Sequence, residues 1–156
     1  MTLQTWLDEF YPTPANSVRS SREAAEHSLR KWEGLRAENL AKHKVDADSH
    51  AREIFDERDA RELFVISGDT CALCQLFADK HDCNGCPLAR VLGNRCDIPL
   101  SEDQEDGVFP YAIWSDTGDP SLMIIMLKEA LRKTSDDELR MPLPERNPDI
   151  EDDAPF

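Results

Sequence analysis

Apolar residues recur at helical spacing in several segments of this chain. In residues 3–11 they stand at i, i+3, i+4 and i+7, which predicts a short helix that docks on the core. The four positions are Leu3, Trp6, Leu7 and Phe10. A longer amphipathic stretch over 20–43 begins with Ser20 and Glu23, the spacing of a capping box, and therefore predicts a second helix. Gly34 weakens that helix, so a break close to it is expected.

The middle of the chain has weaker patterns. Residues 44–50 favour a loop, and residues 50–61 favour a helix because they carry several charge pairs at i,i+4. The run 63–66, Leu-Phe-Val-Ile, is the one convincing β-type segment and predicts a strand that leads to the first cysteine. Asp119 and Pro120 are typical of a helix start. The predicted inward face of that helix consists of Leu122, Met123, Met126, Leu127, Ala130 and Leu131.

These elements predict a mainly α fold with a small β element, arranged as a single domain over 1–134 around a metal site. Residues 135–156 are acidic and contain several prolines, so they are expected to form an irregular C-terminal tail. The core is expected to join the long helix, the strand and the late helix. Its predicted members are Leu29, Trp32, Phe64, Ile66, Leu76, Phe77, Leu122, Met126 and Leu127.

The net charge narrows the range of expected partners. The chain has 156 residues and a formal charge of −14, of which residues 101–119 and 135–156 together supply −12. A strongly acidic chain weighs against direct binding to a phosphate backbone, since Lys and Arg supply most of that affinity. No apolar run is long enough to cross a bilayer, and Asp8 and Glu9 argue against a signal peptide. We therefore expect a cytoplasmic protein with no membrane contact.

All five cysteines lie within residues 71–96, as two C-x2-C pairs and a single cysteine. They are Cys71, Cys74, Cys83, Cys86 and Cys96. A C-x2-C turn brings two thiolates to one ion, and Gly85 suits the tight turn that this requires. Two such knuckles are typical of a closed structural zinc site, so the sequence predicts a Zn²⁺ ion held by the first four cysteines. In the alternative ligand set, Cys96 takes the place of Cys83.

Other interpretations of the cysteines were weighed against zinc. The odd number of cysteines argues against a disulfide framework. A thioredoxin-type pair needs a βαβ setting, and no parallel sheet is predicted. An iron–sulfur cluster is the alternative cofactor, although the ferredoxin spacing is absent. His81 is a substitute ligand in principle, and a solvated loop histidine is the simpler interpretation.

Three stretches of the chain resemble small cysteine-rich proteins of phages and their bacterial hosts. They are the segment 6–12, WLDEFYP, the segment 27–35, HSLRKWEGL, and the pairing of C-x-L-C with C-x-G-C-P-L followed by Cys96. The resemblance extends over most of the chain up to residue 133 and leaves out the acidic tail. It implies a small accessory protein of a mobile element that binds a host factor, and it implies no particular activity.

Signatures of common enzymes are missing from the sequence. No histidine has the H-x-E spacing of zinc deaminases, and the H-E-x-x-H, Walker A, G-x-G-x-x-G and G-x-S-x-G motifs do not occur. A third class of function is that of a metal-supported hydrolase or nuclease. Such an enzyme needs a histidine that converges with other catalytic side chains, whereas His27 is typical of a packed or surface helix residue. We therefore expect a protein that is not an enzyme.

The expected function is that of a zinc-stabilised interaction protein that binds a host macromolecule, specifically a basic protein. Four acidic residues lie in one loop without a basic neighbour, directly before an aromatic segment, and such a surface combines electrostatic steering with apolar contact area. The predicted partner-binding residues are Glu102, Asp103, Glu105, Asp106 and Tyr111. In a simpler interpretation, Phe109 and Trp114 belong to the core and the loop is merely solvated. The alternative function is that of a zinc-ribbon-like nucleic-acid-binding regulator, whose basic patch would consist of Arg90, Arg95, Lys128, Arg132 and Lys133.

Overall fold

The computed structural model of the chain describes residues 2–59, 61–67, 70–81, 86–92, 96 and 109–133, and over 77–81 it describes the backbone only. This part of the chain is mainly helical with a small antiparallel sheet, which confirms the predicted mainly α fold with a small β element. The acidic loop and the C-terminal tail of the prediction lie outside it. The elements in chain order are α1 (Leu3–Phe10), the 3-10 helix η1 (Ala15–Ser17), α2 (Ser21–Glu33), α3 (Ala37–His43), β1 (Val45–Asp48), β2 (Glu53–Asp56), β3 (Leu63–Val65), α4 (Ala72–His81), α5 (Pro87–Leu92), α6 (Pro110–Thr117) and α7 (Ser121–Lys133).

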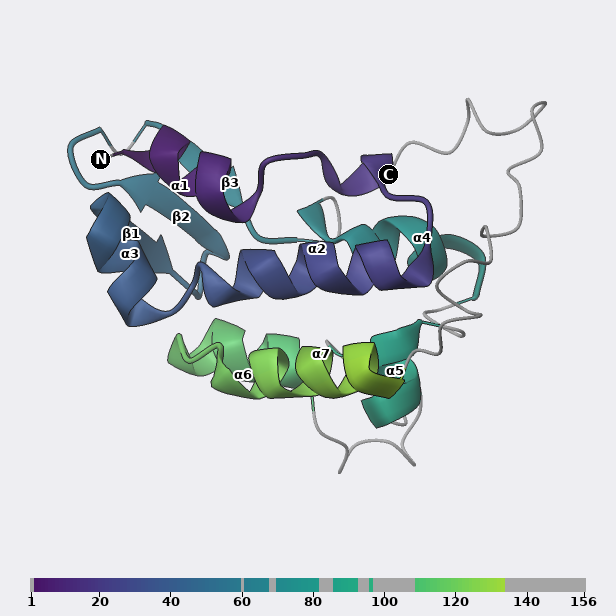
Figure 1. The fold of residues 1–156 in the computed structure, drawn as a ribbon. Coiled ribbons are helices and arrows are strands. Elements are labelled where there is room, and N and C mark those ends of the chain that lie inside the picture. The colour runs from purple at the N-terminus through teal and green to yellow at the C-terminus, as the bar shows by residue number, and fades with distance from the viewer. Residues whose placement is uncertain are drawn as a thin grey trace.

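Helix α2 runs through the middle of the fold (Figure 1). The sheet lies at its C-terminal end together with α1 and α3, and α4 and α7 pack along α2 itself. Helices α5 and α6 both contact α7. All three tryptophans of the chain are buried, and the rings of Trp32 and Trp114 meet edge to face with their centroids 5.3 Å apart. The core therefore forms around α2, between the early and the late parts of the chain.

Most of the predicted core is confirmed. Trp32, Ile66 and Leu127 are buried, and four further predicted members are half-buried against them: Leu29, Phe64, Leu76 and Met126. The side chain of Phe77 lies outside the described residues, and Leu122 is half-buried. The inward face of α7 is rotated from the predicted one, because it centres on Met123, Ile124, Leu127 and Ala130.

The predicted helix over 3–11 is confirmed as α1. Thr2 caps it, because its hydroxyl accepts from the backbone N–H of Thr5 while the Thr5 hydroxyl accepts from the N–H of Thr2. The helix buries Leu3, Trp6 and Phe10. Its position is set by the indole N–H of Trp6, which donates to the carbonyl oxygen of Gly34 at 2.8 Å.

The predicted helix over 20–43 is present, with the expected break. Ser20 accepts from the backbone N–H of Glu23 at 3.1 Å and begins α2, which ends at Glu33. After a turn the chain continues as α3. A Cβ atom on Gly34 would lie 2.6 Å from Phe10 Cγ and 2.7 Å from Trp6 Cζ2, so a glycine is needed where α1 crosses the chain.

The predicted loop over 44–50 and helix over 50–61 are wrong, because these residues form the antiparallel hairpin β1–β2. The i,i+4 charge pairs suggested a helix, whereas burial alternates along β2, with Ile54 and Asp56 turned inward. Arg52 adopts a positive φ of 60° in the connecting turn. The strand predicted over 63–66 is confirmed as β3, and it pairs with β2 to give the strand order β1-β2-β3.

The later helix starts are also confirmed. Pro87 is the first residue of α5, a position that favours proline. The carboxylate of Asp119 accepts from the backbone N–H of Ser121 at 2.9 Å and caps α7. The short aromatic segment predicted over 109–114 is part of a helix, α6, which ends at Gly118 with a φ of 79°.

A hydrogen-bonded clamp joins α1 to α3. His43 is 3% exposed, and its Nε2 donates to Glu9 Oε1 at 2.6 Å while its Nδ1 lies 2.9 Å from Thr5 Oγ1. Lys42 Nζ donates to the same carboxylate at 3.0 Å. Both ring nitrogens of His43 are occupied, so this histidine–carboxylate pair holds two helices together.

Gly34→Ala is expected to destabilise the protein by about 1–3 kcal/mol, since the added methyl group overpacks the contact with Trp6 and Phe10. Chemical denaturation measures the change. In a Phe10→Leu background the same substitution should cost less, because part of the clashing ring is removed. Equal stability of Gly34→Ala and the parent would contradict the close contact.

Glu9→Gln is expected to reduce stability by about 1 kcal/mol at pH 7, a modest amount because the Glu9 side chain is 40% exposed. The hydrogen bonds from His43 and then Lys42 hold the pKa of Glu9 below its usual 4.5, so this contribution is present above that pH and is lost as the pH falls further. Thermal melts from pH 7 to pH 3 should therefore converge for parent and variant. The control is Glu26→Gln, which breaks the exposed pair with Arg22 and should have a smaller effect.

Candidate metal centre

The first cysteine pair lies at the start of α4, after the turn that follows β3. The Thr70 hydroxyl donates to the Val65 carbonyl at 2.8 Å and accepts from the backbone N–H of Ser67 at 3.1 Å. These contacts fix the chain immediately before Cys71. Cys74 follows in the first turn of the helix, so the two sulfur atoms lie on the same side of the chain.

The Cys71 sulfur is set up as a thiolate. The backbone N–H of Cys74 donates to Cys71 Sγ at 3.4 Å, and the Ser28 hydroxyl lies 4.0 Å from the same sulfur atom. The hydrogen bond from the Cys74 side chain, with help from the ammonium group of Lys31, lowers the pKa of Cys71 to about 5 against the opposing effect of burial. The thiolate is the form of cysteine that binds metal ions.

A lysine that the sequence did not single out lies beside these sulfur atoms. Lys31 is 1% exposed, and its Nζ donates to the carbonyl oxygen of Thr70 at 2.9 Å. Burial lowers the pKa of Lys31, and the charges of the cysteine side chains at 71, 74 and 96 oppose that shift. A signal for Lys31 does exist in the sequence, since it shares one helix face with Ala24 and Ser28 at i, i+4 and i+7.

The second group of cysteines is described in part. Cys86 is buried directly before α5, and its carbonyl accepts from the backbone N–H of Arg90 at 3.0 Å. Cys96 is half-buried, and its carbonyl accepts from the backbone N–H of Tyr111 at 2.9 Å, which ties it to α6. No disulfide joins the described cysteines to one another. Cys83 lies outside the described residues.

A complete metal site is not assembled in the described part of the chain. No group of three or more His, Cys, Asp or Glu side chains is placed there to hold a metal ion. Cys71, Cys74, Cys86 and Cys96 are all described, so neither the alternative set nor the three described members of the predicted set are gathered around one point. The predicted set depends on Cys83. The donor chemistry fits zinc, because Cys71 and Cys74 present paired sulfur atoms and the backbone N–H of Cys74 donates to Cys71 Sγ.

The histidines near this site have other contacts. His27 Nε2 donates to the Thr13 carbonyl at 2.7 Å, and its ring meets that of Tyr11 with centroids 5.0 Å apart. Burial lowers the pKa of His27. The Nδ1 atom is buried and has no hydrogen-bond partner in the described residues. The His81 side chain lies outside them.

Tyr111 is the one predicted partner-binding residue that the structure describes. Its hydroxyl donates to the Ile66 carbonyl, and its ring packs 6.1 Å from that of Trp32 and 6.0 Å from that of Trp114. The guanidinium carbon of Arg52 lies 5.4 Å from the centroid of the same ring, which is a cation–π contact. Tyr111 therefore contributes to core packing. The four acidic residues predicted to act with it, Glu102, Asp103, Glu105 and Asp106, lie outside the described residues.

The basic residues proposed for nucleic-acid binding are largely engaged by carboxylates. Lys128 Nζ lies 3.5 Å from Glu33 Oε1. Arg132 and Lys133 both pair with Glu129 within α7. Arg90 is exposed on α5, and Arg95 lies outside the described residues. These ion pairs give each of the three cations of α7 a carboxylate partner, although Glu129 is the one acidic residue of that helix and is shared by Arg132 and Lys133.

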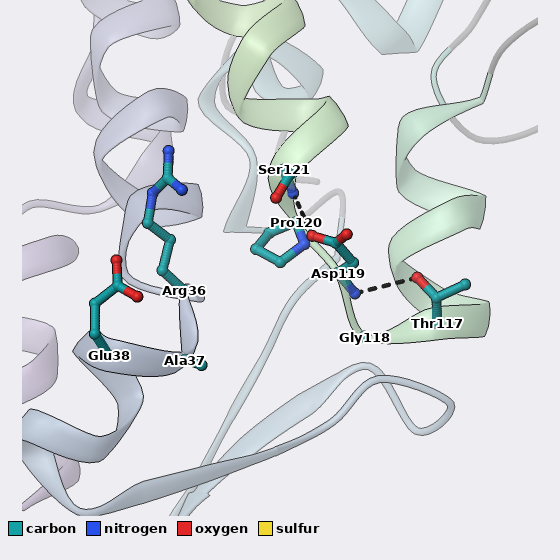
Figure 2. Close-up of a pocket in the computed structure, with 8 residues that line it drawn as sticks. All are labelled: Arg36, Ala37, Glu38, Thr117, Gly118, Asp119, Pro120 and Ser121. Carbon is teal, nitrogen blue, oxygen red and sulfur yellow. Dashed lines mark hydrogen bonds between the residues drawn. The ribbon is translucent and has the colours of Figure 1, made fainter.

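A shallow hollow of about 340 Å³ lies between the α2–α3 turn and the α6–α7 turn (Figure 2). It is lined by Arg36, Ala37, Glu38, Thr117, Gly118, Asp119, Pro120 and Ser121. Its main charged groups already have partners: Arg36 pairs with Glu33 at 2.7 Å and Asp119 caps α7. The lining has no cysteine or histidine and mixes both signs of charge, so it indicates no particular ligand.

Comparisons with protein-family models, curated proteins and solved structures find no match to this chain. Within the described residues, no helix is long and apolar enough to cross a membrane. The functional argument therefore rests on the chemistry of the chain itself.

Proposed function

We propose that this chain is a zinc-stabilised interaction protein, with a Zn²⁺ ion held by Cys71, Cys74, Cys83 and Cys86, or with Cys96 as the alternative fourth ligand. The observation that carries the proposal is the Cys71–Cys74 pair, in which one sulfur atom is stabilised as a thiolate at the start of a helix. Four thiolates form a closed site, which stabilises a fold and leaves no position for substrate.

The proposed metal would tie the start of α4 to the start of α5. Cys71 directly precedes α4, Cys74 lies in its first turn, and Cys86 directly precedes α5. Helix α5 contacts α7, so the ion would connect two parts of the core that are distant along the chain. The zinc ion when bound supplies charge neutralisation and a cross-link, and the folding of this region is then coupled to metal binding.

The interaction part of the proposal rests on charge. The chain carries −14 overall, and the described cations on α7 are paired with carboxylates. A basic protein is therefore the partner class that the electrostatics favour, with the carboxylates of residues 102–106 as the proposed contact. The resemblance to phage and bacterial accessory proteins agrees with a host protein in that role.

The purified protein is expected to contain about one zinc ion per chain, and removal of the metal with a chelator should lower its melting temperature. Elemental analysis and thermal melts measure both quantities. Cys74→Ser should abolish tight zinc binding and loosen residues 71–96 while α2 stays helical. Cys83→Ser and Cys96→Ser, made side by side, should differ, since only the variant that keeps all four ligands retains the metal.

Two results would contradict the zinc site. A folded, metal-free protein whose melting temperature does not respond to zinc would remove the site altogether. Iron with acid-labile sulfide in protein purified without oxygen would replace zinc by an iron–sulfur cluster on the same thiolates.

Neutralising Glu102, Asp103, Glu105 and Asp106 to Gln and Asn is expected to weaken capture of basic proteins from a bacterial lysate, with melting unchanged. Binding by the parent should fall with added salt, because exposed charges are screened over ~10 Å at about 0.1 M ionic strength. The control neutralises Asp136, Asp137, Asp152 and Asp153, the same number of charges in the tail. Equal loss in both variants would show a general charge effect, and no loss in either would exclude the loop as the contact.

A further inference from the structure

Lys31 is the most unusual charged residue in the described structure. It lies on the face of α2 that packs against α4, and its side chain is 1% exposed. An ammonium group in such a place is strongly unfavourable unless hydrogen bonds and opposite charges compensate it. One hydrogen bond is present, from Nζ to the carbonyl oxygen of Thr70 at 2.9 Å. The carbonyl is neutral and does not balance the charge.

The hydrogen bond of Lys31 places its ammonium group next to the cysteine pair, because Thr70 is the residue directly before Cys71. Among the described residues Lys31 forms no ion pair with a carboxylate. The charges of Cys71, Cys74 and Cys96 raise the pKa of Lys31 against the larger effect of burial. Helix α2 presents a second polar group to the same place, the Ser28 hydroxyl, 4.0 Å from Cys71 Sγ. Ser28 and Lys31 stand one helical turn apart, so α2 supplies two polar side chains to the cysteine pair from within the core.

We propose that Lys31 is a positioning residue of the cysteine metal centre, whose buried ammonium group balances the negative charge of the metal-bound thiolates. The inference rests on the proposed zinc site and assigns a role to a residue outside its ligands. A divalent ion with four thiolates carries a net negative charge, and a core environment makes that charge unfavourable unless a cation lies near it. Lys31 supplies the cation, and its bond to Thr70 holds the backbone that leads into Cys71.

Substitutions of Lys31 can separate the effect of its charge from that of its packing. Lys31 Nζ also lies 5.8 Å from the ring centroid of Trp32, a cation–π contact, and its aliphatic stem is buried in the core. A methionine keeps most of that packing and removes both the charge and the hydrogen bond. A glutamine keeps a donor for the Thr70 carbonyl and removes the charge. Lys31→Met therefore tests the charge and the hydrogen bond together, with packing largely kept, and Lys31→Gln tests the charge alone.

The experiment measures zinc affinity by competition with a chromophoric chelator, on full-length parent, Lys31→Met, Lys31→Gln and the control Lys128→Met. Lys128 is 57% exposed and pairs with Glu33, so its removal changes the net charge equally without touching the site. Both Lys31 variants should bind zinc about 10–100-fold more weakly than the parent, and Lys128→Met should bind like the parent. With cobalt in place of zinc, the thiolate-to-metal absorption of the Lys31 variants should persist, which shows that the ligands are unchanged.

Each result decides something different. Parent-like affinity in Lys31→Gln overturns the charge-balancing role, and circular dichroism confirms that this variant, the closest to lysine in hydrogen bonding, is folded. Loss of the cobalt–thiolate absorption in both variants assigns Lys31 to folding alone. A parent chain that binds no zinc overturns the proposed metal centre and this inference with it, whereas a parent that binds zinc and variants that bind it equally overturn the inference alone.

Discussion

The burial of one lysine side chain constrains the centre of this protein. Lys31 lies in the core, and its Nζ donates to the carbonyl oxygen of Thr70, directly before the cysteine pair at the start of α4. Helix α2 must therefore keep one face against the cysteines, and its hydrogen bond to Thr70 fixes where α4 begins. The neighbouring residue Trp32 packs against Trp114 of α6, so the same helix also positions the late part of the chain. The cysteine pair and the aromatic core consequently both pack against α2.

At the C-terminal end of α2, close packing requires a residue without a side chain at position 34. Trp6 and Phe10 cross the chain directly above Gly34, close enough that a side chain there would collide with both rings. This contact ends α2, redirects the chain into α3 and brings His43 to Glu9. The buried carboxylate of Asp56 then accepts from the backbone N–H of Leu3 at 3.2 Å, which attaches the sheet to α1. A short N-terminal helix thereby connects the sheet to the helical core.

Sequence patterns predicted the parts of this structure in which local chemistry and burial agree. The caps at Ser20 and Asp119, the break at Gly34 and the strand after residue 62 were all recognisable because the responsible groups are local. The hairpin was missed because its charged residues mimic helical pairs, and its identity depends on pairing with β3. Lys31 was missed because a lysine is normally exposed. The candidate metal site was located by cysteine spacing, but spacing does not reveal which four sulfur atoms converge.

The described cations occupy two kinds of environment, the core and the surface. In the described structure Lys31 is buried beside sulfur atoms, while Lys42, Lys128 and Arg132 lie at the surface against carboxylates. These surface cations have carboxylate partners, and the sequence holds an excess of acidic residues over 101–119 and 135–156. A partner that neutralises this excess gains favourable long-range attraction before any contact forms. Lys31 is buried and therefore does not take part in contacts at the surface. The metal centre and the proposed interaction surface can therefore be altered separately.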